Sequence, residues 1–245
     1  DDIDEDGLVL TVSDTVNIIV SISGFEVTFG AFQDWNGTEA LTFTINDNQG
    51  RAIATDSVDV IVTPVNDAPV LAEIGSQETD EDTSLVLTLE AIDVEDDDLT
   101  FSAISEHPEN VSAEVIGDQL TLTPAEDWNG SVNISVTVSD GEFTNSETFV
   151  LTVNPVNDAP TIALPESVTF AEDGSLVDNF TQYIDDIDED ALTLTVSGNE
   201  NITVSIDGFA VTFGAVQDWN GTETLTFTVN DNHQGRAIAS DAIDV

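Results

Sequence analysis

The hexapeptide Pro-Val-Asn-Asp-Ala-Pro occurs twice in this chain, at residues 64–69 and again at residues 155–160. Two identical segments this far apart indicate a chain built of repeats, so the period has to be found before any local motif is interpreted. The two prolines stiffen the backbone of the hexapeptide, and its Asn-Asp pair presents three side-chain oxygens. We therefore expect a rigid linker between domains that carries potential oxygen ligands.

A second motif sets the register of the repeats. Asp-Trp-Asn-Gly occurs at residues 34–37, 127–130 and 218–221, once in each of three copies. The outer copies are nearly duplicates, because the acidic segment at residues 1–6 returns unchanged at residues 185–190. The middle copy diverges more, so the larger period is a two-domain unit of about 184 residues.

This register predicts three repeats, spanning residues 1–66, 67–157 and 158–245. The first repeat is expected to lack its N-terminal strand region, and the third to lack the end of its last strand. The chain would then be one part of a longer array of such repeats. Incomplete terminal repeats would also suit a subunit whose end strand completes the sandwich of another copy.

Charge and composition narrow the class of protein. Fifty acidic residues and only two arginines give a formal charge of −48, yet 40% of the chain is hydrophobic, as in a folded globular protein. Because phosphates would be repelled, nucleic acid is excluded as a partner. No apolar run approaches the length of a membrane span, so no direct membrane insertion is expected. Cysteine is absent, and disulfides therefore do not stabilise the fold.

Apolar residues of the middle copy alternate with polar ones, the period of a half-buried β-strand. No segment shows a sustained helical period. Seven short strands in about ninety residues fit a two-sheet Greek-key sandwich. We predict an all-β chain of tandem seven-stranded sandwiches arranged end to end as a rod, with Trp128 capping a core. The expected strands are Val70–Leu71, Leu85–Leu89, Leu99–Ala103, Ala113–Val115, Leu120–Leu122, Val132–Val138 and Phe149–Val153.

The carboxylates gather at particular turns. In the middle copy these turns lie at residues 81–82, 93–95, 126–127 and 140–141. Sandwich topology brings such turns to the two ends of a domain, where the linkers also lie. Ca²⁺ takes six to eight oxygen ligands in irregular geometry, so it can use carboxylates from several turns at once. The acidic turns and the linkers together favour a calcium site at each junction.

The motifs resemble bacterial cadherin-like repeats of the Val-Asn-Asp-Ala-Pro type, which occur in tandem in large surface adhesins. The resemblance covers essentially the whole chain and implies Ca²⁺ as the cofactor. At the second junction it implies seven ligands, with Glu126 a weaker addition: Glu81, Asp127, Asn157, Asp158, Asp186, Asp188 and Asp231. At the first junction it implies six: Asp34, Asn66, Asp67, Asp93, Glu95 and Asp140.

Departures from the vertebrate cadherin pattern leave the number of ions per junction open. The linker lacks the upstream Asp and the second Asn of vertebrate linkers, and the turn before the sixth strand carries Gln33 and Gln217 in the outer copies. An EF-hand at residues 2–7 is discarded, because Ser13 stands where its bidentate Glu would be and no flanking helices are expected. A solvated acidic surface accounts for many of the other carboxylates.

Three functions follow from these patterns. The first is a calcium-stiffened extension segment of a secreted or cell-surface repeat adhesin, which projects or links other domains and contacts neighbouring repeats, other copies or a host surface. The second is a self-assembling extracellular filament subunit joined by strand complementation. The third is a carbohydrate-binding module. No Gly-x-Ser-x-Gly turn, cysteine or repeated histidine points to catalysis, so no enzyme is expected.

Overall fold

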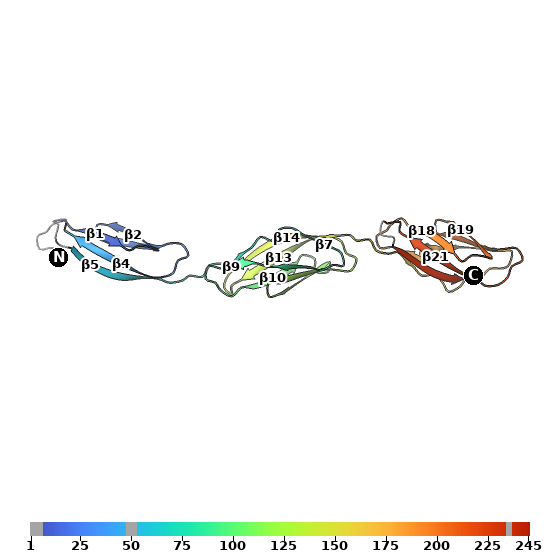
Figure 1. Cartoon of the computed structure of the whole chain (residues 1–245), viewed down its shortest axis with the longest axis horizontal. Helices are drawn as coiled ribbons and strands as arrows, with labels where there is room; N and C mark the ends of the chain where they lie inside the picture. The colour runs from blue at the N-terminus through green and yellow to red at the C-terminus, as the bar shows by residue number, and fades with distance from the viewer. Residues whose placement is uncertain (1–6, 48–52, 234–236) are drawn as a thin grey trace.

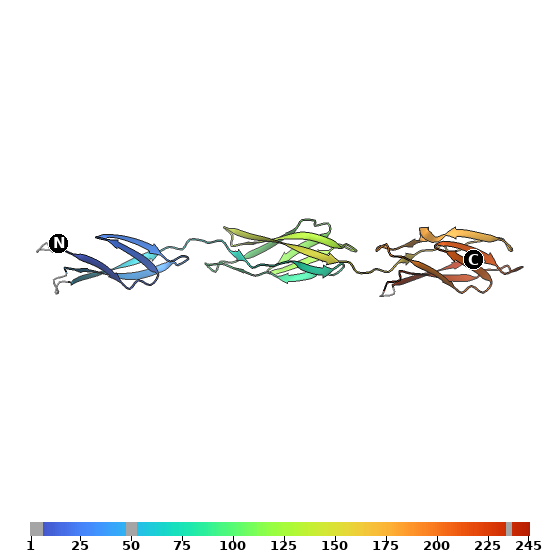
Figure 2. The same cartoon turned by 90° about the horizontal axis from the view of Figure 1, so that it is seen from above.

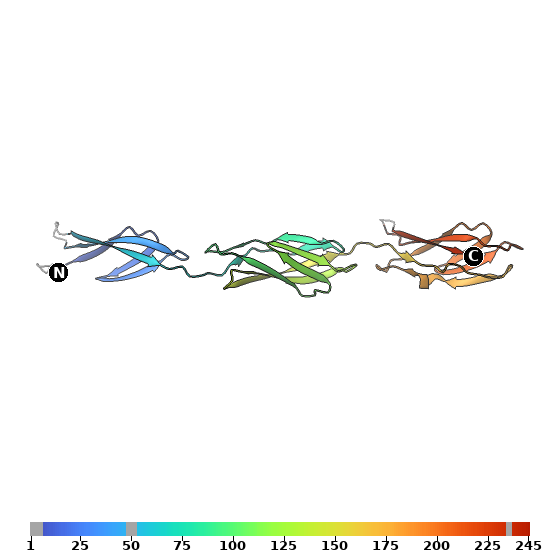
Figure 3. The same cartoon turned by 90° about the horizontal axis from the view of Figure 1, so that it is seen from below.

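The structure is a computed structural model that describes residues 7–47, 53–233 and 237–245. Three β-rich bodies lie one after another along a single long axis, joined by extended linkers (Figure 1). The same end-to-end order is seen after rotation about that axis, from above and from below (Figures 2 and 3). The linkers coincide with the two proline-bounded hexapeptides, whose prolines cannot donate to a sheet. The fold class is therefore the predicted tandem array of β-sandwiches.

The middle repeat has two facing sheets. One has the strand order β10-β13-β14-β7, the other has the order β11-β12-β8, and β6 pairs with β9 beside them. All of these pairs are antiparallel except β7 with β14, which is parallel. The strands are β6 Val70–Leu71, β7 Gln77–Asp80, β8 Leu85–Thr88, β9 Ala91–Ile92, β10 Thr100–Ser105, β11 Val111–Ile116, β12 Gln119–Pro124, β13 Gly130–Ser139 and β14 Thr144–Asn154.

Alternation along these strands places one set of side chains between the sheets. In β13, every second residue from Val132 to Val138 is buried, while the residues between them remain at least partly exposed. These side chains pack with Leu120, Leu122 and Leu151 into one core, as the period of two requires. The sandwich therefore directs its turns, and with them the acidic residues, to the two ends of the body.

The structure also contains strands that the apolar pattern did not reveal. Strand β7 has the sequence Gln-Glu-Thr-Asp, which shows no apolar alternation. Backbone pairing with β14 holds it at the sheet edge. The short β9 follows β8 after a break at Leu89. These two strands matter for the site, since β7 leads directly into the acidic turn at Glu81 and β9 leads into the turn at Asp93.

The third repeat repeats this plan. Its sheets have the orders β16-β20-β19 and β18-β21-β22, with β15 paired to β17. A 3₁₀ turn, η1, follows β16 and places Phe180 fully inside the core. The elements are β15 Thr161–Ile162, β16 Ser175–Asn179, η1 Phe180–Tyr183, β17 Ile184–Asp185, β18 Thr193–Ser197, β19 Ile202–Asp207, β20 Ala210–Ala215, β21 Thr224–Asn230 and β22 Ile238–Asp244.

The first repeat is a thinner body. Its sheets have the orders β1-β4-β5 and β2-β3, so the second sheet has one strand fewer than its counterpart in the third repeat. Among its described residues, only the apolar side chains of Ile18 and Leu41 are buried. The strands are β1 Val9–Ser13, β2 Ile18–Ser23, β3 Glu26–Ala31, β4 Gly37–Asn46 and β5 Ile53–Val62.

The tryptophan of the Asp-Trp-Asn-Gly motif lies in the turn between two strands and packs inward. Trp128, between β12 and β13, is partly buried against the core of the middle repeat. Its ring lies over Gly130, where an added Cβ would meet Trp128 Cζ2 at 3.0 Å, and the glycine has φ +146°. The motif therefore needs its glycine, and the ring belongs to the core, as expected.

Candidate metal centre at the second linker

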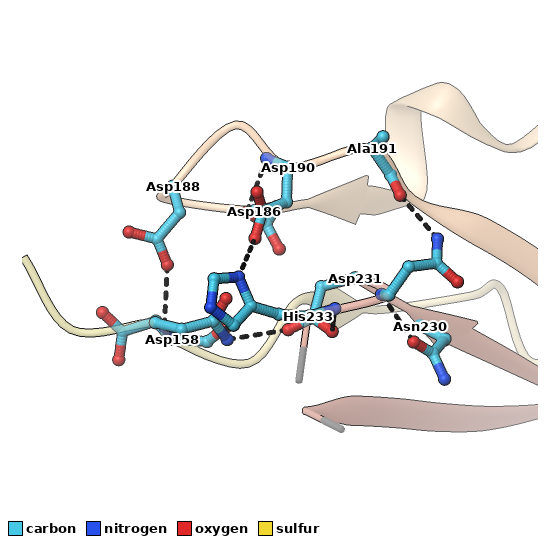
Figure 4. Close-up of polar contacts among 10 residues, drawn as sticks. Asp158, Asp186, Asp188, Asp190, Ala191, Asn230, Asp231 and His233 are labelled. Atoms are coloured by element: carbon cyan, nitrogen blue, oxygen red, sulfur yellow. Dashed lines mark hydrogen bonds and ion pairs between the residues drawn. The ribbon is translucent and has the colours of Figure 1, made fainter. Parts of the chain in front are cut away.

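The second linker is held by acidic side chains from both of the repeats that it joins. The N–H of Val156 donates to the carboxylate of Glu81 in the middle repeat. The Asp158 N–H donates to Asp188 Oδ2 of the third repeat at 2.7 Å, a contact visible in Figure 4. Since linker residues two positions apart are bound by different repeats, the two repeats meet at the linker backbone.

The middle repeat contributes two acidic turns. Glu81, only 3% exposed, follows β7 and also accepts a hydrogen bond from Asn129 Nδ2 at 3.2 Å. Asp82 and Asp127 both have positive φ, at +56° and +55°, and the N–H of Asp127 donates to Asp82 Oδ1 at 3.1 Å. Aspartate tolerates this left-handed conformation because its short side chain bonds nearby backbone. The two turns therefore hold their carboxylates side by side.

The third repeat contributes an acidic loop after β17. Asp186, Asp188 and Asp190 alternate along this loop, and the Asp190 N–H donates to Asp186 Oδ1 at 3.2 Å. Figure 4 shows the three side chains on the side of the loop that faces Asp158 and Asp231. His233 lies beside these aspartates, with its Nδ1 3.6 Å from Asp190 Oδ2.

Asn157 connects the linker to strand β21. Its Nδ2 donates to Asp231 Oδ2 and to the Asp158 carbonyl oxygen, each at 2.8 Å. The hydrogen bond from Asn157, and next the one from the His233 backbone N–H, hold the pKa of Asp231 below its usual value. Asp231, which is 4% exposed, is thus kept ionised inside the junction.

Three groups of carboxylates come together at this junction. Within each group, one oxygen from every member lies within 4.8 Å of the others. Asp158 belongs to two of the groups, and burial, followed by the charges of Asp127 and Asp188, raises the pKa of its carboxyl. The groups are Glu81 with Asp158 and Asp188; Asp82 with Asp127 and Asp158; and Asp186 with Asp188 and Asp190.

The donor chemistry of the junction fits a hard divalent cation. Three buried oxygens, Asn157 Oδ1, Asp186 Oδ2 and Asp190 Oδ2, have no hydrogen-bond partner. A buried oxygen without a partner is costly, and a raised carboxyl pKa marks negative charge that lacks compensation. Carboxylate and amide oxygens in this number are the ligands that Ca²⁺ takes, and no sulfur ligand is present in the chain.

The structure places all seven residues expected at the second junction around the linker. It adds two that sequence comparison missed, Asp82 and Asp190. Asp190 could have been found from the alternation of aspartates in the loop, which continues one step beyond the expected pair. Asp82 also had a signal, since it belongs to the acidic turn at residues 81–82, although the resemblance assigns it no ligand role.

The first junction is more open. Asn66 Nδ2 donates to Asp140 Oδ2, and the Asp67 N–H donates to Glu95 Oε2, each at 3.0 Å. Asp34, Asp67 and Glu95 line one cavity beside the linker. Among the described residues, no three carboxylates of this junction approach as closely as those of the second junction.

Asp93 lies beside the first junction and accepts backbone N–H groups of its own loop, as Asp186 does at the second junction. Its Oδ1 accepts the backbone N–H of Glu95 at 3.0 Å and that of Asp97 at 3.2 Å, while its Oδ2 is buried without a partner. The acidic segment at residues 2–7, considered as an EF-hand loop, falls mostly outside the described residues.

Comparison with protein families agrees with the geometry. A family model described as a cadherin-like domain matches residues 65–154, and one described as a bacterial Ig domain matches residues 157–243. The middle repeat is thus similar to a cadherin-like domain and the third repeat to a bacterial Ig domain. The cadherin-like match ends at the second linker and the bacterial Ig match begins there, so the site lies between two recognised domains. A search of curated proteins finds no significant match.

Solved structures with similar folds include cadherins. Human CDH23 EC21-23 has a TM-score of 0.63 at 14% identity, with 98% of this chain and 89% of that one covered. Mouse cadherin-23 EC22-24 has a TM-score of 0.59 at 18% identity, with 98% and 85% covered. The protocadherin gamma-B4 extracellular domain has a TM-score of 0.53 at 17% identity, and 97% of this chain covers 44% of it. At these identities the likeness establishes the fold.

Cadherin-like and Ig-like domains are typically extracellular, non-enzymatic modules of adhesion or extension, and cadherin-like domains typically bind Ca²⁺. An endo-fucoidan hydrolase also aligns, at a TM-score of 0.36 and 19% identity over 96% of this chain and 38% of that one. A likeness at that level carries no argument about activity. In the part of the chain that the structure describes, no helix has the length and apolarity needed to cross a bilayer.

Proposed function

We propose that this chain is a calcium-stiffened extension segment of an extracellular repeat adhesin, without catalytic activity of its own. The observation that carries the proposal is the second junction, where carboxylates from both repeats and from the linker converge on Asp158. At neutral pH they repel one another, because two unit charges about 4.8 Å apart interact by about 3.5 kcal/mol at an effective dielectric near 20. A divalent cation bound between the carboxylates would replace this repulsion with attraction, because they would coordinate the same ion.

Each repeat would supply part of the ligand set. Glu81, Asp82 and Asp127 would hold the ion on the side of the middle repeat, and the acidic loop would hold it on the side of the third. Asp158 would be shared between them, since it approaches carboxylates of both repeats. When bound, Ca²⁺ supplies the positive charge that locks the two repeats at one angle. Because neighbouring repeats contact each other only at such junctions, their stiffness determines the length of the array.

Small-angle X-ray scattering on the whole chain tests this function. We expect a longer maximum dimension in millimolar Ca²⁺ than in excess EDTA at matched ionic strength, since a bound divalent ion would add resistance to bending at the junctions. Mg²⁺ should not substitute fully, because it demands near-ideal octahedral geometry and keeps much of its water. Equal dimensions in Ca²⁺ and EDTA would refute calcium stiffening. The carboxylates would then serve to keep the surface solvated.

A further inference from the structure

The middle repeat has an open cavity beside strand β9, at the end of the repeat nearer the first linker (Figure 1). Its volume is about 540 Å³, which falls within the roughly 300–1,000 Å³ of small-molecule sites. The buried residues Leu71 and Leu89 and the partly buried Phe101 belong to its apolar wall. Glu90 and Asp118, both exposed, line it as well. The cavity therefore lies within the middle repeat, between its two linkers.

Backbone hydrogen bonds match the residues around this cavity with residues of the third repeat. In each repeat one bond ends at the residue before a short strand, β9 or β17, and another ends in the turn between β11 and β12 or between β19 and β20. The equivalent N–H to carbonyl bonds are Ala72 to Glu90 at 2.8 Å and Ala163 to Tyr183 at 2.9 Å, and Leu89 to Asp118 at 2.7 Å and Phe180 to Phe209 at 2.8 Å. The third repeat therefore has aromatic residues at three positions where the middle repeat has none: Tyr183 for Glu90, Phe180 for Leu89 and Phe209 for Asp118.

These aromatic residues fill the corresponding part of the third repeat. Phe180 is fully buried, and its ring packs edge to face with that of Tyr183, with centroids 5.7 Å apart. Tyr183 and Phe209 are partly buried and pack against the same core. In the middle repeat Leu89 and Glu90 are adjacent, so the two extra residues that η1 inserts between their counterparts are missing. The cavity of the middle repeat thus lies where the third repeat places aromatic rings.

The edge of this cavity is both apolar and acidic. Val70 and Ile92, which line it, are 54% and 73% exposed. Glu90 and Asp118 add two carboxylates in a repeat that contains neither lysine nor arginine. Apolar side chains left in water around a cavity are typical of a binding site. An aromatic ring with a cation beside it matches both the apolar wall and the acidic edge.

We propose that this cavity binds an aromatic side chain from a basic peptide segment of another protein. The ring packs against Phe101, as the rings of η1 pack against the core of the third repeat. A lysine or arginine next to the ring pairs with Glu90 or Asp118. A second copy of this chain is a poor source of such a segment, because it has no lysine, only two arginines and a charge of −48. This binding role goes beyond extension and does not rest on bound Ca²⁺.

Fluorine NMR with the whole chain tests the proposal. The probe is the capped tripeptide Arg-Phe-Arg with para-fluorophenylalanine at its centre, in about 0.15 M salt, where the Debye length is about 8 Å. We expect a saturable shift of the fluorine resonance with one site per chain. Unlabelled Arg-Ala-Arg should compete at least about tenfold more weakly than Arg-Phe-Arg, because no ring enters the cavity. Gln-Phe-Gln should compete about threefold to tenfold more weakly, because it lacks the cations.

A double variant of the chain locates the site. Glu90→Tyr combined with Asp118→Phe copies the aromatic residues of the third repeat, so it should fill the cavity and weaken binding of the probe at least about tenfold. The control is Glu114→Tyr, which adds a ring and removes a charge at an exposed position on β11. It should leave the affinity within about twofold, since Glu114 does not line the cavity. Thermal melts show whether both variants are folded.

The peptide series leaves the chain unchanged, so a variant that fails to fold cannot imitate its result. Equal competition by Arg-Ala-Arg would mean attraction to the acidic surface alone and would overturn the proposal. Absence of a saturable shift would do so too, as would undiminished binding to the folded double variant. A dimer of the chain in sedimentation that the peptide does not dissociate would also contradict it, if the double variant abolished that dimer, because a second copy would then cover the cavity.

Discussion

Replacing Asp158 by Asn should change stability in opposite directions with and without Ca²⁺. Asp158 lies within 4.8 Å of carboxylates in two groups, and each such pair repels by about 0.9 kcal/mol in water and about 3.5 kcal/mol at an effective dielectric of 20. Because the junction is half-buried, we expect the lower part of this range. In EDTA, Asp158→Asn should therefore raise the free energy of unfolding by about 1–2 kcal/mol.

In Ca²⁺ the same variant removes a charged ligand. An affinity that falls tenfold or more lowers the ligand-linked stabilisation by at least about 1.4 kcal/mol at saturating ion. Thermal melts in millimolar Ca²⁺ and in EDTA, at matched ionic strength, measure both effects. Glu114→Gln is the control, since it removes one charge from an exposed position on β11 of the middle repeat, away from the junction. Equal shifts for the two variants, or destabilisation by Asp158→Asn in both conditions, would refute the reasoning.

Two further predictions concern stability away from the junction. Gly130→Ala should lower the free energy of unfolding by about 2 kcal/mol or more, because its Cβ would meet the ring of Trp128. Gly117→Ala, with φ +64° and open space around it, should lower it by about 1 kcal/mol. Equal losses for the two variants in denaturant titrations would contradict the packing argument. Burial raises the pKa of Glu223, but three backbone N–H groups at residues 200–202 outweigh this and lower it overall. Since its folded pKa lies below the unfolded one, the stability that it contributes is present above about pH 4.5 and lost as pH falls through the folded pKa. Glu223→Gln should thus cost about 1–2 kcal/mol at pH 7 and progressively less as the pH falls below about 4.5. Asp207→Asn, at an exposed position, is the control for loss of one charge.

Much of this architecture could be predicted from the sequence, because apolar alternation and the linker motif are local signals. The strands of the middle core and the inward packing of Trp128 follow from them directly. Strand β7 could not be predicted in this way, since it is polar and its pairing with β14 depends on two segments far apart in the chain. Because none of its four residues is apolar, the alternating exposure of its side chains leaves no hydrophobic pattern in the sequence.

The candidate site shows the same division. Residue types at fixed spacings indicated the ligand set of the second junction, but not how closely the carboxylates approach. The sequence placed Asp82 in an acidic turn, but its hydrogen bond from the N–H of Asp127 joins two turns far apart in the chain. At the first junction three of the six expected residues, Asp34, Asp67 and Glu95, line one cavity. The distance between side chains of two domains depends on how the linker is bound on both sides, which is a property of the fold.

The one parallel pairing in the middle repeat bears on how the array carries load. The linker before this repeat leads toward β7 and the linker after it continues from β14, so tension along the rod pulls these two strands in opposite directions. Four residue pairs between them then resist together in shear, whereas antiparallel hairpins loaded at one end open one bond at a time. Under traction these four pairs let the middle repeat transmit force between its two linkers.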